Sequence, residues 1–211
     1  MDKIMKLIKA NLNDIIKPSA VLLAICIVIP LALSLTNAVT RERIAKLAAE
    51  NEIKTMSALI AADEFELLTC IGSNKNPDFD FYIALKDGKH QGYIFITSAK
   101  GYGGEVSVMT AVTPDKKVKA VSILDATNET PGLGQNVTKE GFYSQFSQKS
   151  ADITLVKNGA ESENNEINAV TGATISSRAV TKAVNEALER FDRCVNKSLI
   201  PSVKEAETDE Q

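Results

Sequence analysis

The stretch FDFYIALKDGKHQGYIFITSA, residues 79–99, decides the fold of the C-terminal part of this chain. Apolar and polar residues alternate on both sides of the turn-forming residues 86–89, which is typical of two half-buried strands joined in a hairpin. Two similar runs follow at 106–113 and 118–126, separated by a PDKK turn. Successive antiparallel strands, without the regular strand–helix alternation of a doubly wound sheet, predict an α+β domain built on an antiparallel sheet.

Helical patterns flank these strands. Residues 41–70 are rich in Ala, Glu, Lys and Leu at near-helical spacing, so we expect a helical connector of one or two helices. A turn-rich break follows at 72–77, and helix periodicity returns at 176–195 with the apolar side chains on one side. The polar stretch 156–165 is expected to be a loop, and residues 198–211 a disordered acidic tail.

An uncharged apolar run extends from Pro18 to Thr40. At ~1.5 Å per residue it is long enough to cross ~30 Å of hydrocarbon, so we expect a transmembrane helix over 18–40, kinked at Pro30. Four lysines precede the run and three basic residues follow it closely. The positive-inside rule therefore gives only weak support to a cytoplasmic segment at 1–17. A signal peptide cleaved near residues 36–38 and a buried core helix are the alternatives.

Composition excludes several classes of function. The net charge of −3 gives no basic face for nucleic acid. The three cysteines form no C-x-x-C pair and His90 is the single histidine, so we expect no metal or haem site. Cys26 lies in the apolar run, which leaves Cys70 and Cys194 as the pair that could bond. We expect these thiols to be unpaired.

Three short motifs carry the chemistry: GYGG at 101–104, ETPGLGQ at 129–135 and NAVTGATISS at 168–177. The glycines of the first two are typical of tight turns. Neither motif is a dinucleotide fingerprint, because Val106 and Val137 stand where the third glycine would be required.

The third motif places small residues directly before an amphipathic helix. The start of a helix offers free N–H groups and positive dipole character, which suit a phosphate, and the nearby hydroxyls are further donors. Alternatively, Thr174 or Ser176 is a simple N-cap. On the residues alone, the cap interpretation is favoured.

The third motif resembles the S/T-G-A-T flavinylation motif of the FMN-binding domain family. This family includes the G subunit of the Rnf electron-transport complex and the C subunit of the sodium-pumping NADH:quinone reductase. ETPGLG and GYGG also resemble their counterparts, in the same order behind one membrane helix, and the chain length is nearer to that of the Rnf protein. The family often has aspartate where this chain has Asn168, a position thought to help the flavin transferase recognise its target.

The resemblance implies an FMN-binding domain over 71–197, with FMN bonded through its phosphate to Thr174 and no catalytic residue. The other implied cofactor contacts are Thr171, Gly172, Ala173, Ser176, Glu129, Thr130, Gly132, Leu133 and Gly134. The ETPGLG loop would pack against the isoalloxazine ring, where Glu129 is either a hydrogen-bonding group or a solvated turn carboxylate. Tyr102 and Tyr143 could stack on the flavin, although packing is the default expectation for both.

The resemblance further implies an electron-carrying subunit of a cell-membrane complex that couples electron transfer between ferredoxin and NAD to ion translocation. Its partners would be the other subunits, a flavin transferase and the lipid bilayer. Because the transferase acts outside the cytoplasm, residues 41–211 would be extracytoplasmic. The alternatives are the C subunit of the sodium-pumping quinone reductase, and a membrane-tethered binding or assembly module without redox activity, in which Thr174 is only a cap.

Overall fold

The structure is a computed structural model that describes residues 2–71, 77–150, 152–161 and 164–196. It divides into two compact units, residues 1–52 and 53–211. The predicted tail at 198–211 lies outside the described residues, as does most of the predicted break at 72–77.

Helix α1 spans Asp2–Leu59 and contains Pro18 and Pro30. Among the described residues it is the one helix long and apolar enough to cross a membrane, with a mean hydropathy of 2.5 in its most apolar part. Its apolar side chains between residues 16 and 39 are exposed, as lipid-facing side chains would be. The predicted apolar helix is present, but it continues without a break into the region expected to be a separate connector.

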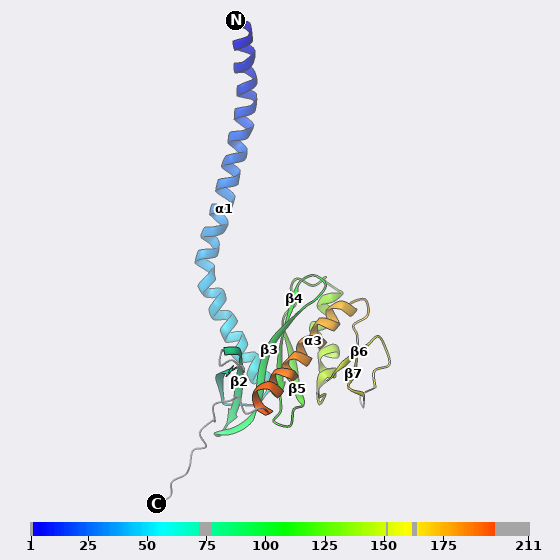
Figure 1. Ribbon diagram of the computed structural model, residues 1–211. Coiled ribbons are helices and arrows are strands. Elements are labelled where there is room, and N and C mark those ends of the chain that lie inside the picture. The colour runs from blue at the N-terminus through cyan, green and yellow to red at the C-terminus, as the bar shows by residue number, and fades with distance from the viewer. Residues whose placement is uncertain (1, 72–76, 151, 162–163, 197–211) are drawn as a thin grey trace, which may run out of the picture. The chain divides into compact units, whose positions relative to one another are not determined.

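A five-stranded antiparallel sheet with the strand order β1-β2-β3-β4-β5 forms the centre of the second unit (Figure 1). Its strands are β1 (Glu64–Ile71), β2 (Pro77–Lys86), β3 (Lys89–Lys100), β4 (Glu105–Val112) and β5 (Val118–Asp125). Positive φ angles at Asp87 and Gly88 close the β2–β3 turn, as a two-residue hairpin requires. The antiparallel sheet and the hairpin at 79–99 are therefore confirmed.

The prediction of a helical connector is wrong over its last part. Helix α1 ends at Leu59, and Glu64–Ile71 is an edge strand that pairs with β2 from Glu64 opposite Leu85 to Cys70 opposite Phe79. The Glu and Leu residues of this stretch favour a helix when taken alone. Pairing with β2 outweighs that preference, because tertiary context overrides intrinsic propensity.

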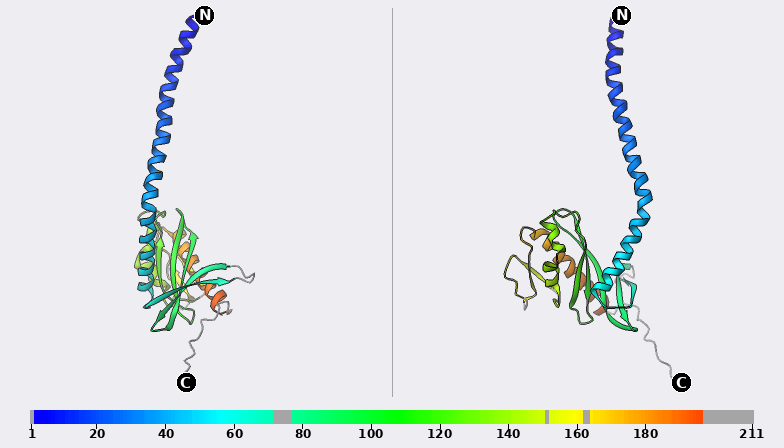
Figure 2. Two further views of the ribbon diagram at one scale, coloured as in Figure 1. Left: turned by 90° about the vertical axis from the view of Figure 1, so that its left-hand side faces the viewer. Right: turned by 180° about the vertical axis from the view of Figure 1, so that it is seen from behind.

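The sheet is covered on both faces. Helix α3 (Thr174–Phe191) packs on one face, mainly against β3 and β4, as the views in Figures 1 and 2 show. On the other face, Met56 and Ile60 pack against Ile94 and Met109. The two faces of one sheet thus support two separate apolar cores.

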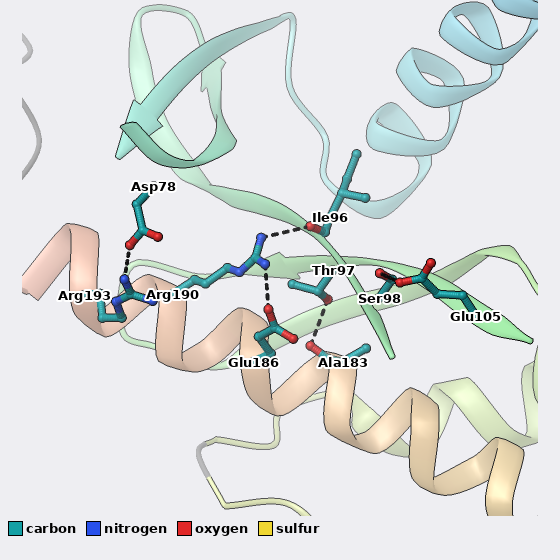
Figure 3. A network of polar contacts seen from close by, with 9 residues as sticks. All are labelled: Asp78, Ile96, Thr97, Ser98, Glu105, Ala183, Glu186, Arg190 and Arg193. Carbon is teal, nitrogen blue, oxygen red and sulfur yellow. Dashed lines mark hydrogen bonds and ion pairs between the residues drawn. The ribbon is translucent and has the colours of Figure 1, made fainter. Parts of the chain in front are cut away.

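Polar contacts fix α3 on the sheet (Figure 3). The Thr97 hydroxyl donates to the carbonyl oxygen of Ala183 at 2.8 Å. Arg190 donates to the carbonyl oxygen of Ile96 at 3.3 Å and pairs with Glu186 at 2.6 Å. These bonds hold the helix in register with β3, so the position of its first turn is set by the sheet.

Short elements connect β5 to α3. They are η1 (Gly134–Thr138), α2 (Glu140–Tyr143), η2 (Ser144–Phe146), β6 (Thr154–Val156) and β7 (Glu166–Asn168). Strands β6 and β7 form a separate parallel pair. The loop expected at 156–165 begins one residue too early, because Val156 is the last residue of β6; residues 162–163 lie outside the described residues. Sequence patterning did not reveal either short strand.

A disulfide joins Cys70 in β1 to Cys194 in the π-helical turn η4 (Asp192–Asn196) that follows α3. The expectation of unpaired thiols is therefore wrong for these two residues, while Cys26 is free. Arg193, the residue before Cys194, forms an ion pair with Asp78 in β2. The two cysteines are 124 residues apart, and the fold brings them together by extending α3 to the edge of the sheet.

Candidate functional site

The three sequence motifs meet at the buried side chain of Glu129, which is 1% exposed. Its carboxylate accepts a hydrogen bond from the backbone N–H of Gly103, at 3.0 Å, and another from the Ser176 hydroxyl. One residue of each motif therefore takes part in a single cluster. Glu129 is a buried hydrogen-bonding group and not a solvated turn carboxylate.

The glycines around this carboxylate leave no room for a side chain. A Cβ at Gly101 would lie 2.2 Å from Glu129 Oε1. A Cβ at Gly134 would lie 2.6 Å from Glu129 Oε2 and 2.9 Å from Ser176 Oγ. Both glycines are therefore required by the close approach of the backbone to the carboxylate, which goes beyond the tight-turn interpretation.

The loop between β5 and η1 is braced by its own polar groups. Asp125 Oδ1 accepts hydrogen bonds from the backbone N–H and the hydroxyl of Thr127, both at 2.8 Å, and these bonds lower the pKa of the Asp125 carboxyl. Gln135 donates to the carbonyl oxygen of Thr127 at 3.2 Å, and Asn136 donates to that of Gly132 at 2.7 Å. These hydrogen bonds fix the backbone of the loop that carries Thr130 and Leu133.

Thr174 is the first residue of α3, and Ala173 occupies the N-cap position without a capping side chain. The capping interpretation of Thr174 and Ser176 is therefore wrong. Ser177 braces this turn instead, since its hydroxyl accepts from Val170 N at 3.0 Å and donates to Ala173 O at 2.9 Å. Within the described part of the chain, the half-buried Thr174 hydroxyl has no hydrogen-bond partner.

A cavity of about 510 Å³ opens beside Thr174. Its walls combine all three motifs: Tyr102, Thr130, Leu133, Gly134, Gly172, Ala173, Thr174, Ile175 and Ser176. Tyr102, Leu133 and Ile175 are 71%, 48% and 48% exposed, so large apolar surfaces face solvent here. Exposed apolar surface next to a helix start is suited to a ligand with a flat apolar part and an anionic part.

A second, smaller cavity of about 240 Å³ also has Thr174 in its wall. It is lined by Lys157, Asn158, Ala169, Val170, Thr171, Gly172 and Thr174. Thr174 lines both cavities, and Lys157 is the one charged residue among the described residues that line either. Sequence reasoning missed Lys157, because nothing in the polar stretch 156–165 distinguished it.

The structure brings most of the expected contact residues together. Those lining the larger cavity are Thr130, Leu133, Gly134, Gly172, Ala173, Thr174 and Ser176, while Thr171 lines the smaller one. Glu129 lies behind the cavity wall. Gly132 lines neither cavity and serves the turn, where its φ is +75°.

The other candidate side chains lie elsewhere. Tyr143 lines a separate groove along β5. His90 packs edge-on against Tyr93, with ring centroids 4.3 Å apart, and the accompanying loss of solvent lowers its pKa. The described residues contain no group of three or more His, Cys, Asp or Glu side chains that could hold a metal ion.

Residues 101–189 match the family model described as the FMN-binding domain. The chain is 49% identical over 112 residues to the G subunit of the proton-translocating ferredoxin:NAD(+) oxidoreductase complex of Clostridium ljungdahlii, covering 53% of this chain and 59% of that relative's length. It is 34% identical over 192 residues to the G subunit of the Na(+)-translocating ferredoxin:NAD(+) oxidoreductase complex of Acetobacterium woodii, covering 84% of this chain and 91% of the relative.

Solved structures share the fold. NqrC of Shewanella oneidensis is 26% identical, with a TM-score of 0.52 over 65% of this chain and 71% of that chain. The C subunit of the Na(+)-translocating NADH-quinone reductase of Parabacteroides distasonis is 20% identical, with a TM-score of 0.51 over 63% of this chain and 77% of that one.

Proposed function

The chain belongs to the family of G subunits of ion-translocating ferredoxin:NAD(+) oxidoreductase complexes, and from that membership we propose that it carries electrons on FMN bonded through its phosphate to Thr174. The observation that carries the proposal is the Thr174 hydroxyl, which has no hydrogen-bond partner among the described residues. Thr174 is the first residue of α3 and lines both cavities. The flavin transferase would use a flavin dinucleotide as donor: Thr174 Oγ1 bonds to the flavin-side phosphorus, the pyrophosphate bond breaks, a nucleoside monophosphate leaves and the hydroxyl proton is released.

The geometry suits both the phosphate and the ring system of FMN. The first hydrogen bond at the start of α3 runs from Ser177 N to Ala173 O at 2.9 Å. The N–H groups of Thr174, Ile175 and Ser176 therefore precede the intrahelical ladder and can face an anion. Tyr102, Leu133 and Ile175 offer the apolar surface that a flavin ring requires.

The remaining residues of the site position the flavin. A bound flavin supplies the electron-transfer chemistry, and the protein needs neither a nucleophile nor a metal for turnover. Glu129 holds the GYGG loop and the first turn of α3 together behind the cavity. Other members of the complex must supply and remove the electrons.

We place the second unit outside the cytoplasm, anchored by the apolar part of α1 in the cell membrane with residues 1–17 inside. The disulfide between Cys70 and Cys194 supports this location, because disulfides persist in oxidising compartments. The apolar helix and the lysines before it agree with the same orientation. A flavin transferase on the outer side would then meet Thr174 there.

A non-redox assembly module is the competing function, and it requires Thr174 to be only a cap. The geometry opposes that role, because Ala173 holds the cap position and Ser177 makes the bracing bonds. Mass spectrometry separates the two functions when the full chain is produced together with a flavin transferase. The peptide containing Thr174 should gain the mass of FMN less one water.

The matched variants are Thr174→Ala and Thr154→Ala, which remove one threonine hydroxyl each; Thr154 is exposed in β6 and lines neither cavity. Thr174→Ala should abolish in-gel flavin fluorescence, whereas Thr154→Ala should keep it. An unmodified wild-type peptide would refute the electron-carrier proposal. Fluorescence retained in Thr174→Ala would refute the attachment site.

A further inference from the structure

Strands β6 and β7 end at the same edge of their small sheet, so the segments that follow them in the sequence leave the sheet side by side. They run parallel, with Val156 opposite Asn168, and the pairing continues through a bond from Ala169 N to Val156 O at 2.8 Å. Parallel strands have their carboxyl ends at one edge, where α/β folds commonly place ligands. Lys157 therefore leaves the sheet beside the loop that leads to Thr174.

The segment carrying Lys157 is held in place by Asn168. The Asn168 Oδ1 atom accepts a hydrogen bond from Ala160 N at 3.0 Å. Gln145 in turn fixes the Asn168 backbone, since its Oε1 accepts from Asn168 N at 2.8 Å and its Nε2 donates to Asn168 O at 3.3 Å. Both segments that line the smaller cavity are thus tied to one residue.

The two cavities that Thr174 lines differ in charge. The larger cavity has no charged residue in its wall, and the smaller one has Lys157 alone. Lys157 forms no ion pair with any residue that the structure describes. Its ammonium group and the start of α3 are therefore the sources of positive charge at the smaller cavity.

We propose that Lys157 pairs with the phosphodiester that links the flavin to Thr174, and that the smaller cavity receives the phosphate oxygens. This inference rests on the proposed attachment at Thr174. The phosphodiester is a monoanion, and the polar cavity around Lys157, Asn158 and Thr171 offers it a cation and neutral hydrogen-bonding groups. The larger cavity, whose wall is more apolar and also includes Thr174, is left for the ring system.

Phosphorus NMR of the flavinylated full chain in detergent micelles tests the pairing, because the protein then holds one covalently bound phosphorus. The variants are Lys157→Gln, which removes the charge, and Lys157→Arg, which keeps it. Lys182→Gln is the matched control, since Lys182 is also exposed but lines a different groove along α3. Thermal unfolding of each variant verifies that the fold is intact.

The phosphorus resonance should shift in Lys157→Gln, return toward the wild-type position in Lys157→Arg, and stay in place in Lys182→Gln. In wild-type protein carrying ¹³C-dimethylated lysines, the Lys157 methyl resonance should shift on flavinylation. Identical phosphorus resonances in wild type and Lys157→Gln would overturn the pairing, and so would equal shifts in Lys157→Gln and Lys182→Gln. Absence of any bound phosphorus would instead overturn the attachment at Thr174.

Discussion

The Ser176 hydroxyl donates a hydrogen bond to the Glu129 carboxylate, and this contact joins the first turn of α3 to the loop that follows β5. The same carboxylate accepts the backbone N–H of Gly103. The flavin site that we propose is therefore supported from behind by one buried acidic side chain.

Glu129→Ala should destabilise the domain, because it leaves the buried Ser176 hydroxyl without an acceptor and also removes the acceptor of the part-buried Gly103 N–H bond. An unsatisfied buried donor costs about 1–3 kcal/mol, so we expect a loss of this size in the free energy of unfolding. Thermal or denaturant unfolding measures it. Glu129→Gln is the control, since its carboxamide oxygen can still accept, and it should lose less. Equal stability of Glu129→Ala and wild type would contradict a supporting role for Glu129.

Gly134→Ala should damage the same cluster by overpacking. Its Cβ would lie within 3 Å of both Glu129 Oε2 and Ser176 Oγ, and crowding of this kind costs about 1–3 kcal/mol. Gly141→Ala is the matched control, because its Cβ would meet nothing within 4 Å and the residue lies in α2. We expect Gly134→Ala to lower both the unfolding temperature and the yield of covalent flavin, and Gly141→Ala to lower neither. An unchanged unfolding temperature in Gly134→Ala would contradict the close approach of the backbone to Glu129.

The variant Cys70→Ala/Cys194→Ala should lower the free energy of unfolding by about 2–5 kcal/mol, as is usual when a native disulfide is removed. A reducing agent should destabilise the wild type in the same direction and leave the variant unaffected. Intact mass under non-reducing conditions should show the wild type lighter than its reduced form by two hydrogens. Cys26→Ala provides the control, since Cys26 is free. Two alkylatable thiols besides Cys26 in denatured, unreduced protein would contradict the bond.

Asn168→Asp should leave flavinylation close to the wild-type rate, because aspartate also offers an acceptor to Ala160 N. Asn168→Ala removes that acceptor. It should slow flavinylation, because the segment carrying Lys157 is then no longer held beside residues 168–174. Initial rates with a flavin transferase, followed by in-gel fluorescence, compare the three proteins. If Asn168→Ala matched the wild type, loop positioning would not be the role of this residue.

The sheet was predictable where the local pattern and the tertiary structure agree. The alternation in residues 79–99 and the Asp-Gly turn specify a hairpin without outside help. β1 was not predictable, because its Glu and Leu residues favour a helix until β2 is present as a pairing partner. The parallel pair β6–β7 is too short to leave a periodic signal, at three residues per strand.

The candidate site was indicated by its sequence motifs and not by the physical chemistry of its residues. Helix-start geometry alone favoured a cap at Thr174, and the resemblance to the flavinylation motif reversed that preference. The burial of Glu129 depends on three segments folding around it, so the sequence alone leaves it indistinguishable from a surface carboxylate. Lys157 reaches the cavity only through the β6–β7 pairing, and no local pattern reports that pairing.

The disulfide has a consequence for how this protein is made. Cys194 lies 124 residues beyond Cys70, near the end of the described chain. If the domain is exported as we propose, Cys70 emerges from the translocation machinery well before its partner is available. During that interval it is open to mispairing or to capture by an oxidoreductase. Correct oxidation must wait until α3 has been translocated and has packed on the sheet, so bond formation marks a completed sheet and helix. A stalled or truncated chain would remain chemically distinguishable by the free thiol of Cys70, in addition to that of Cys26.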